Sequence, residues 1–167
     1  MSRRCRKNRF VAAARVRIDA PILQSRYEPS WSKAVTMTDP QTKQCPFCPP
    51  KDREILETHP LAVAIADSFP LTRGHALVVP RRHVASFFEL TAEERVAIVE
   101  LLDRAKAVLD RKYAPDAYNI GINDGAAAGQ TVMHVHVHLI PRYKGDADDP
   151  RGGVRWIFPR KADYWNK

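Results

Sequence analysis

Histidine alternates with valine along one run of this chain, His134-Val135-His136-Val137-His138. Successive side chains of a β-strand point to opposite faces, so a strand here places the three imidazoles on one face and the valines in the core. Three of the six histidines of the chain fall in this run, which argues against incidental surface histidines. The run therefore predicts a strand that lines a cleft with imidazoles.

A loop rich in amides and glycines leads into this run. Asn123 and Gln130 carry amides, Thr131 carries a hydroxyl, and all three are neutral groups suited to phosphate oxygens. Glycines such as Gly129 allow main-chain N–H groups to approach an anion closely. A metal site built from the alternate histidines is the competing interpretation, because imidazole is the commonest ligand for zinc and similar ions. The loop favours phosphate chemistry.

The rest of the chain predicts short strands around one long helix. Thr91 and Glu94 have the spacing of a capping box, and apolar residues then recur every three or four positions, which predicts a helix over 91–112. Apolar or alternating segments bounded by turn formers predict four strands, at 61–66, 76–79, 118–123 and 131–140. Together these elements indicate an α+β fold with an antiparallel β-sheet and one long helix packed on it.

The chain has a length of 167 residues, which fits one globular domain with two tails. Residues 1–44 lack periodicity and predict a basic flexible arm, followed by a folded domain at 45–145 and a carboxyl-terminal tail at 146–167. Much of the formal net charge of +8 lies in the arm, which has no acid before Asp19. A disordered extension is the simplest interpretation of this arm, and an organellar transit peptide or a nucleic-acid-binding arm are the alternatives.

Cysteine usage and hydropathy bear on the compartment. The opening segment lacks the apolar core of a signal peptide, and no later run approaches the ~20 apolar residues that span a bilayer. Three cysteines are too few for a disulfide scaffold, and two of them form Cys45-Pro46-Phe47-Cys48, a spacing typical of metal sites in reducing compartments. The sequence therefore predicts a cytoplasmic protein without a membrane partner. A pair of reduced buried cysteines is the alternative to a metal site.

Two motifs resemble a known family. The segment 129–142, which contains the alternating histidines, is similar to the signature of the histidine-triad (HIT) family, His-φ-His-φ-His-φ-φ with φ hydrophobic. The segment 74–83 resembles the other shared block, Gly-His-x-Leu-φ-φ-Pro-x-x-His, and with Asp67 the resemblance covers about residues 45–145. The Gly-Gln-Thr-Val lead is closer to the fragile-histidine-triad and bacterial dinucleoside-polyphosphate hydrolase branch than to the phosphoramidase branch, which often carries Ser at the position of Thr131.

The resemblance implies a role for each histidine of the run. His136 matches the nucleophile, which attacks the α-phosphorus and forms a nucleotidyl-histidine intermediate that water releases. His138 matches the position that contacts the phosphates, and His134 matches the one that holds the cluster in register. Asp67 aligns with the residue that binds ribose hydroxyls. The implied nucleotide-binding set is Asp67, Asn123, Gly129, Gln130, Thr131, Val132 and His138.

The resemblance also implies a structural zinc ion, a homodimer and a hydrolase. In zinc-binding members, the amino-terminal Cys-x-x-Cys is joined by two histidines, which gives the ligand set Cys45, Cys48, His83 and His134. The helix carries further apolar residues that need a second surface, namely Val96, Val99, Leu101 and Val108. In the tail, Arg155 and Trp156 are candidates for contacts with the far part of a substrate.

The expected activity is hydrolysis of dinucleoside polyphosphates, or of related nucleotide phosphoesters and phosphoramidates, at the α-phosphorus. A nucleotidyl transferase or phosphorylase is one alternative, in which phosphate replaces water as the acceptor. A non-catalytic nucleotide- or nucleic-acid-binding module is another, and the position of His136 argues against it. A nucleic acid is therefore not the expected partner.

Overall fold

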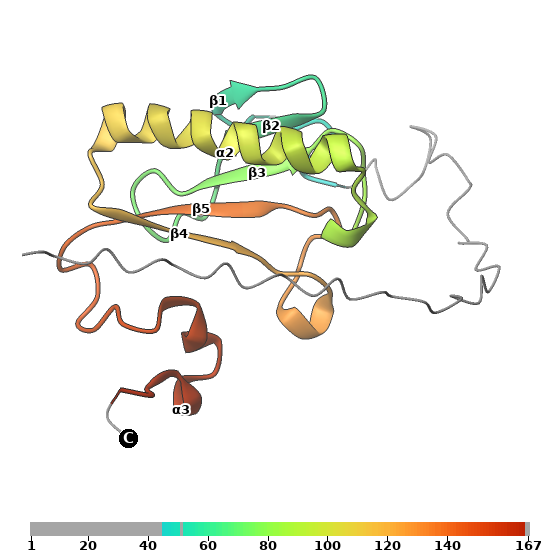
Figure 1. Cartoon of the computed structure of the whole chain (residues 1–167). Helices are drawn as coiled ribbons and strands as arrows, with labels where there is room; N and C mark the ends of the chain where they lie inside the picture. The colour runs from blue at the N-terminus through green and yellow to red at the C-terminus, as the bar shows by residue number, and fades with distance from the viewer. Residues whose placement is uncertain (1–44, 51, 166–167) are drawn as a thin grey trace, which may run out of the picture. The chain divides into compact units, whose positions relative to one another are not determined.

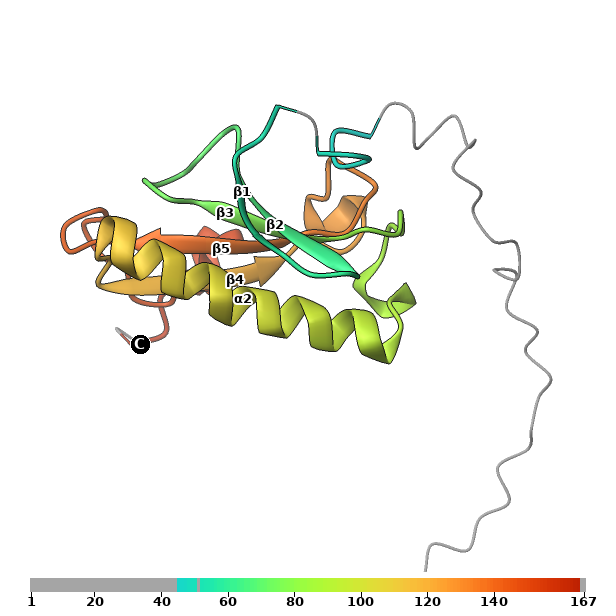
Figure 2. The same cartoon turned by 90° about the horizontal axis from the view of Figure 1, so that it is seen from above.

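The computed structural model describes residues 45–50 and 52–165, so the arm predicted at 1–44 lies outside the described residues (Figure 1). Five antiparallel strands form one sheet in the order β1-β2-β3-β5-β4. The strands are β1 (Ile55–Thr58), β2 (Ala62–Ala66), β3 (Ala76–Pro80), β4 (Ala117–Ile122) and β5 (Val137–Arg142). The long helix α2 (Ala92–Tyr113) covers one face of this sheet (Figures 1 and 2). The predicted α+β class is confirmed.

Helix α2 begins and packs as its sequence predicts. The Thr91 hydroxyl accepts a hydrogen bond from the Glu94 N–H, and the Glu94 carboxylate accepts one from the Thr91 N–H, which closes the capping box. A buried stripe that includes Ile98, Leu101 and Leu109 faces the sheet. Leu101 was expected to need a second surface, and this was wrong because it lies on the same helical stripe as Ile98 and Leu109.

The last strand is shorter at its start than predicted. The strand expected at 131–140 begins only at Val137, because the chain before it leaves the sheet and the Val135 N–H donates to the Val84 carbonyl at 2.7 Å instead. The alternation nevertheless holds, since Val135 and Val137 are buried on the helix side of the sheet and the histidines lie on the other side. The other three predicted strands are confirmed to within one residue at each end.

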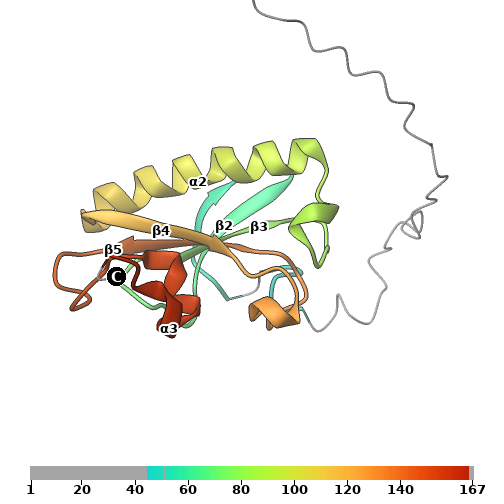
Figure 3. The same ribbon diagram turned by 60° about the horizontal axis from the view of Figure 1, so that its bottom comes forward.

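Two elements had no clear signal in the sequence. Strand β1 lies at one edge of the sheet, is only partly buried and is interrupted by a bulge, so it shows no alternation of apolar and polar residues. Beyond β5 the chain forms two short helices, η3 (Gly153–Ile157) and α3 (Pro159–Ala162). These helices lie on the side of the sheet opposite α2, and η3 contacts β4 (Figures 1 and 3). No helix among residues 45–50 and 52–165 is long and apolar enough to cross a membrane.

Candidate active site and metal centre

His136 has a defined tautomer. Its Nδ1 lies 2.9 Å from the carbonyl oxygen of His134. A carbonyl oxygen can only accept, so Nδ1 carries the proton and Nε2 of the neutral ring holds a free lone pair. His136 is buried, with 8% of the residue exposed, so its surroundings restrict the ring. His136 therefore presents a nitrogen that can act as a nucleophile.

His138 has the opposite tautomer. The Leu71 N–H donates to Nδ1 of the buried His75 at 3.2 Å, and the Asp67 carboxylate near the same nitrogen makes no hydrogen bond to it, so His75 carries its proton on Nε2. Nε2 of His75 lies 3.1 Å from Nδ1 of His138 and donates a hydrogen bond to it. Because Nδ1 of His138 accepts this bond, His138 carries its own proton on Nε2. The rings of His136 and His138 lie edge to face with centroids 5.0 Å apart. An acceptor nitrogen and a donor nitrogen thus stand side by side.

Burial favours the uncharged forms of His75 and His138. It lowers the pKa of His138 to about 4, and repulsion from a protonated His136 or His75 adds to this effect. Burial also lowers the pKa of His75, although Asp67 opposes the shift. The Asp67 carboxylate lies 3.3 Å from Nδ1 of His75 and accepts a hydrogen bond from the Phe69 N–H at 3.0 Å. The residue predicted to bind ribose is therefore placed directly behind the His75–His138 pair.

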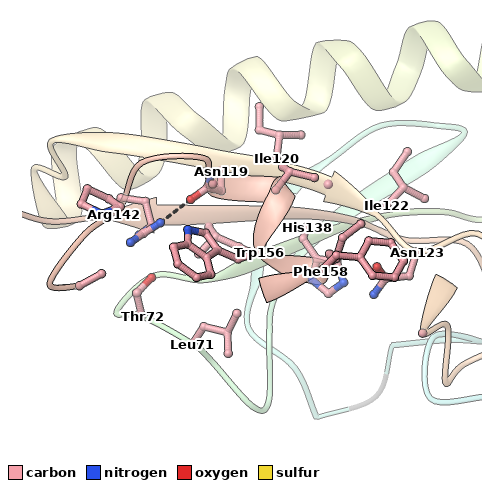
Figure 4. Close-up of a pocket in the computed structure, with 18 of the residues that line it drawn as sticks. Leu71, Thr72, Asn119, Ile120, Ile122, Asn123, His138, Arg142, Trp156 and Phe158 are labelled. Atoms are coloured by element: carbon pink, nitrogen blue, oxygen red, sulfur yellow. Dashed lines mark hydrogen bonds between the residues drawn. The ribbon is translucent and has the colours of Figure 1, made fainter. Parts of the chain in front are cut away.

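A pocket of about 1590 Å³ opens beside His138 (Figure 4). Its floor comes from β4 and β5, and its walls come from the 68–74 loop, the 123–129 loop and the carboxyl-terminal segment. Among the predicted residues, Asn123, Gly129 and His138 line it. Its volume exceeds the ~300–1,000 Å³ of most small-molecule sites, so it has room for a ligand with two parts.

Gln130 supports the loop from inside. Its side-chain oxygen accepts from the Gly125 N–H at 2.7 Å, and its amide nitrogen donates to the carbonyls of Ala85 and Val132. Both ends of the amide are bonded to main chain, so the structure places Gln130 outside the pocket. Thr131 is exposed and Val132 half-buried, and neither of them lines the pocket.

Asp124 is a supporting residue that the sequence did not reveal. Its carboxylate accepts hydrogen bonds from the Ser86 hydroxyl at 3.0 Å and from the Phe87 N–H at 2.7 Å. These contacts join the glycine-containing loop to the start of the short helix η1 (Phe87–Glu89), whose N-cap Ser86 lies 38 residues away in sequence. The only signal was the Asn-Asp-Gly turn itself, which does not identify a distant partner.

The two candidate residues of the carboxyl-terminal segment, Arg155 and Trp156, have different surroundings. The Arg155 guanidinium donates to the carbonyls of Lys161 and Ala162 and stacks on Tyr164, so it serves the segment's own fold. The Trp156 indole N–H donates to the Arg151 carbonyl at 2.7 Å, and the residue lines the pocket (Figure 4). Of the two, only Trp156 is placed to meet a ligand.

A second cluster brings together the four predicted metal ligands. The donor atoms of Cys45, Cys48, His83 and His134 all lie within 4.8 Å of one another. The Cys48 sulfur is 3.3 Å from Nδ1 of His83 and 3.2 Å from Nδ1 of His134, and the Cys45 sulfur is 3.4 Å from Nδ1 of His134. A tetrahedral site with bonds of about 2.3 Å to sulfur and 2.05 Å to nitrogen has S···N edges of about 3.5 Å. The four residues therefore fit a zinc ion.

The protonation of this cluster also suits a metal. The Nε2 atom of His134 lies 2.9 Å from the Pro80 carbonyl, so it carries the proton and leaves the Nδ1 lone pair facing the thiols. Burial lowers the pKa of His134 to about 4, which keeps the ring neutral. Burial and the neighbouring Cys45 raise the pKa of the Cys48 thiol to about 12 when no cation is present. Metal binding must therefore displace a proton from this thiol.

Comparisons with known proteins all point to one family. A family model described as HIT domain matches residues 49–145. The chain is 42% identical over 86 residues to an asymmetrical bis(5'-nucleosyl)-tetraphosphatase of Schizosaccharomyces pombe, a match covering 52% of this chain and 47% of that protein. It is 38% identical over 94 residues to a bifunctional bis(5'-adenosyl)-triphosphatase/adenylylsulfatase of Arabidopsis thaliana, covering 56% and 52%. The chain thus spans about half the length of these two relatives.

Among solved structures, the fold is similar to that of a zinc-bound histidine triad family protein from Mycobacterium smegmatis. The TM-score is 0.58 at 32% sequence identity, and the match covers 63% of this chain and 79% of that one. This match agrees with the predicted fold, an antiparallel sheet with one main helix, although the sequence predicted only four of the five strands.

Proposed function

This chain belongs to the histidine-triad family, and from that premise we propose that it is a nucleotide hydrolase in which His136 attacks the α-phosphorus of the substrate. One observation carries the proposal: the Nδ1 proton of His136 is held by the His134 carbonyl at 2.9 Å, so Nε2 is free to react. The donor tautomer of His138 beside it supplies the complementary group.

The proposed reaction has two displacements. In the first, the lone pair on Nε2 of His136 forms a bond to the α-phosphorus, the bond from phosphorus to the leaving group breaks, and the leaving group keeps that electron pair. The Nε2–H of His138 donates to the oxygens on which negative charge builds up. In the second, a water oxygen bonds to phosphorus, the P–N bond breaks, and its electron pair returns to Nε2 of His136, while one proton of the water is released to solvent.

The proposed substrates are dinucleoside polyphosphates or related phosphoesters and phosphoramidates. Two relatives are named as enzymes that act on bis-nucleosyl polyphosphates, and the pocket has room for a ligand with two parts. We place the phosphates near His138, Asn123 and Gly129, and the carboxyl-terminal segment, through Trp156, at the far part. The other proposed nucleotide-binding residues are Asp67, Gln130, Thr131 and Val132, with Gln130 acting by holding the loop.

Zinc has a separate role in this proposal. Cys45, Cys48, His83 and His134 would hold it, and four protein ligands leave no open position for water. Zinc would therefore stabilise the fold, and the phosphoryl chemistry is assigned to His136 and His138. His134 serves both sites, through its ring to the metal and through its carbonyl to His136.

Product analysis tests the proposed activity. The full chain is incubated with a panel of dinucleoside polyphosphates, adenosine phosphoramidate and nucleoside diphosphates, with and without inorganic phosphate. We expect a nucleoside monophosphate as a product, at a rate that does not depend on added phosphate. If a nucleoside diphosphate formed only when phosphate is present, the activity would be phosphorolysis and not hydrolysis. Binding without turnover across the panel, with a steep dependence on salt, would favour a binding module instead.

We further propose that the protein is a homodimer. Val96 and Val99 on α2 are 57% and 58% exposed, and Ile120 on the edge strand β4 is 52% exposed. An edge strand with exposed apolar residues is readily paired by a second chain. Light scattering at micromolar concentration should return twice the chain mass, and Ile120→Lys should shift the mass towards the monomer. A monomer mass for the unaltered chain contradicts the proposal.

A further inference from the structure

We propose that Phe47 is a positioning residue for the nucleophile, and that through it the metal-binding turn sets the orientation of the His136 ring. This inference rests on the proposed role of His136. Phe47 lies between the two cysteines of the Cys45–Cys48 turn and is 6% exposed. The sequence identified this turn by its cysteines alone.

The Phe47 ring contacts two histidines of the triad. Its centroid lies 5.3 Å from that of His136 at an interplanar angle of 58°, and 5.9 Å from that of His134 at 73°. The His134 pair is edge to face and the His136 pair is tilted, and both lie at distances at which aromatic rings attract one another. Phe47 is therefore packed against both the nucleophile and a metal ligand.

Phe47 is itself held firmly. It belongs to a buried cluster on the face of the sheet opposite α2, and the Arg53 guanidinium lies over its ring at 5.0 Å from the centroid. The other buried members of that cluster are Val63, Ile65, Leu77 and Val79. A ring fixed in this way can restrict the rotation of the neighbouring His136 ring.

The Cys45–Cys48 turn determines the position of the Phe47 ring. The Phe47 N–H donates to the Cys45 sulfur at 3.4 Å, and the Cys48 N–H donates to the Cys45 carbonyl at 3.2 Å. Both cysteines face Nδ1 of His134, at 3.4 and 3.2 Å. The two sulfur ligands and the Phe47 ring are therefore carried by one short, hydrogen-bonded stretch of main chain.

The orientation of the His136 ring depends on packing because one hydrogen bond does not fix it. Rotation of an imidazole about its Cβ–Cγ bond is broad and roughly two-fold, and a flip exchanges the places of Nδ1 and Cδ2. The His134 carbonyl favours one of the two orientations, while the Phe47 ring occupies space on one side of His136 and the edge-to-face His138 lies at 5.0 Å. Removing the phenyl ring would open space in which His136 can turn and its Nε2 can leave the line of attack.

The test compares Phe47→Ala with Phe47→Leu, which keeps most of the apolar volume. We expect Phe47→Ala to lower kcat roughly 10- to 100-fold, since displacement of a reacting group by about 1 Å can cost 10²-fold, while KM changes by less than about 3-fold. Phe47→Leu should restore much of the lost kcat. Leu56→Ala is the matched control, because Leu56 is a partly buried apolar residue packed against the helix-side cluster. It should lower the melting temperature but leave kcat close to that of the unaltered chain.

A second readout does not depend on turnover. In the unaltered chain, imidazole nitrogen NMR should show His136 protonated on Nδ1 and in one orientation, and Phe47→Ala should show exchange between tautomers or orientations at about one bound zinc per chain. Retained kcat in folded, zinc-loaded Phe47→Ala would overturn the proposal. A raised KM with unchanged kcat would also overturn it, because the ring would then contact the ligand instead of the nucleophile.

Two further outcomes are decided by these measurements. If Phe47→Ala does not fold, Phe47→Val carries the test, because valine also removes most of the ring. A lowered kcat with exchange in the His136 signals would support the proposal, and a kcat and an NMR signature identical to those of the unaltered chain would overturn it. If the unaltered chain turns over no nucleotide, the proposed function fails, whereas a changed His136 signal in Phe47→Ala still supports the positioning contact.

Discussion

Replacement of His136 by alanine is expected to lower kcat by at least ~10³-fold and to leave substrate affinity nearly unchanged, because the covalent route is lost while the binding groups remain. The ring makes one side-chain hydrogen bond, to the His134 carbonyl, so its loss should not unfold the domain. Steady-state kinetics and equilibrium binding of a nucleoside monophosphate measure the two quantities separately. Mass spectrometry after quenching in denaturant at alkaline pH, at which a P–N bond to imidazole survives, should detect a nucleotidyl adduct on the unaltered chain and none on His136→Ala.

His59→Ala is the matched control for this prediction. His59 lies between β1 and β2, where its Nδ1 accepts from the Leu61 N–H, and it does not line the pocket beside His138. Its removal should leave kcat within about 3-fold of the unaltered chain. If His136→Ala retained more than about a tenth of the original turnover, His136 would not be the nucleophile.

Replacement of Cys48 by serine is expected to remove the zinc and to lower the melting temperature by roughly 10 °C, which corresponds to ~3 kcal/mol for a domain of this size. The physical reason is that the Cys48 sulfur faces both histidines of the proposed metal site, at 3.3 and 3.2 Å, and a serine hydroxyl is a much weaker zinc ligand than a thiolate. Metal analysis of protein purified without added zinc should find about one zinc per chain before the substitution and close to none after it. Differential scanning calorimetry gives the melting temperatures.

Cys5→Ser provides the control, since Cys5 is the third cysteine of the chain and lies outside the described residues. It should keep the zinc content and the melting temperature. Unchanged melting in Cys48→Ser, or a metal content near zero in the gently purified unaltered chain, would contradict a structural zinc ion held by these four residues.

Local patterns predicted the elements whose signals are local. The capping box at Thr91 and Glu94 placed the start of α2 to within one residue, because both partners lie in the same helical turn. The alternation of histidine and valine predicted the two faces correctly even where the strand itself is absent, since extended main chain alternates with or without a partner strand. The start of β5 was missed because it depends on the Val135 to Val84 hydrogen bond, which joins distant segments.

In the site too, features with a local signal were predictable and features that join distant segments were not. The motifs brought His134, His136 and His138 to one face, and their spacing was sufficient for that. The engagement of Gln130 with the main chain, and the Leu71–His75–His138 series of hydrogen bonds, were not predictable, because each joins loops whose approach is set by the packed sheet. A residue type states what a side chain can bond, and only the fold decides whether that capacity is already used.

The buried imidazoles behind the pocket have a consequence for selectivity. Because burial depresses the pKa values of His75 and His138, this part of the site carries no positive charge at neutral pH. Among the residues that the structure describes, the one cation lining the pocket is Arg142, and Asp146 and Asn119 already engage it. Attraction for an anion must then come from directed N–H donors, whose strength depends on angle and distance. Such a surface discriminates by shape, so abundant small anions such as chloride and sulfate would compete only weakly for the place that a nucleotide phosphate occupies.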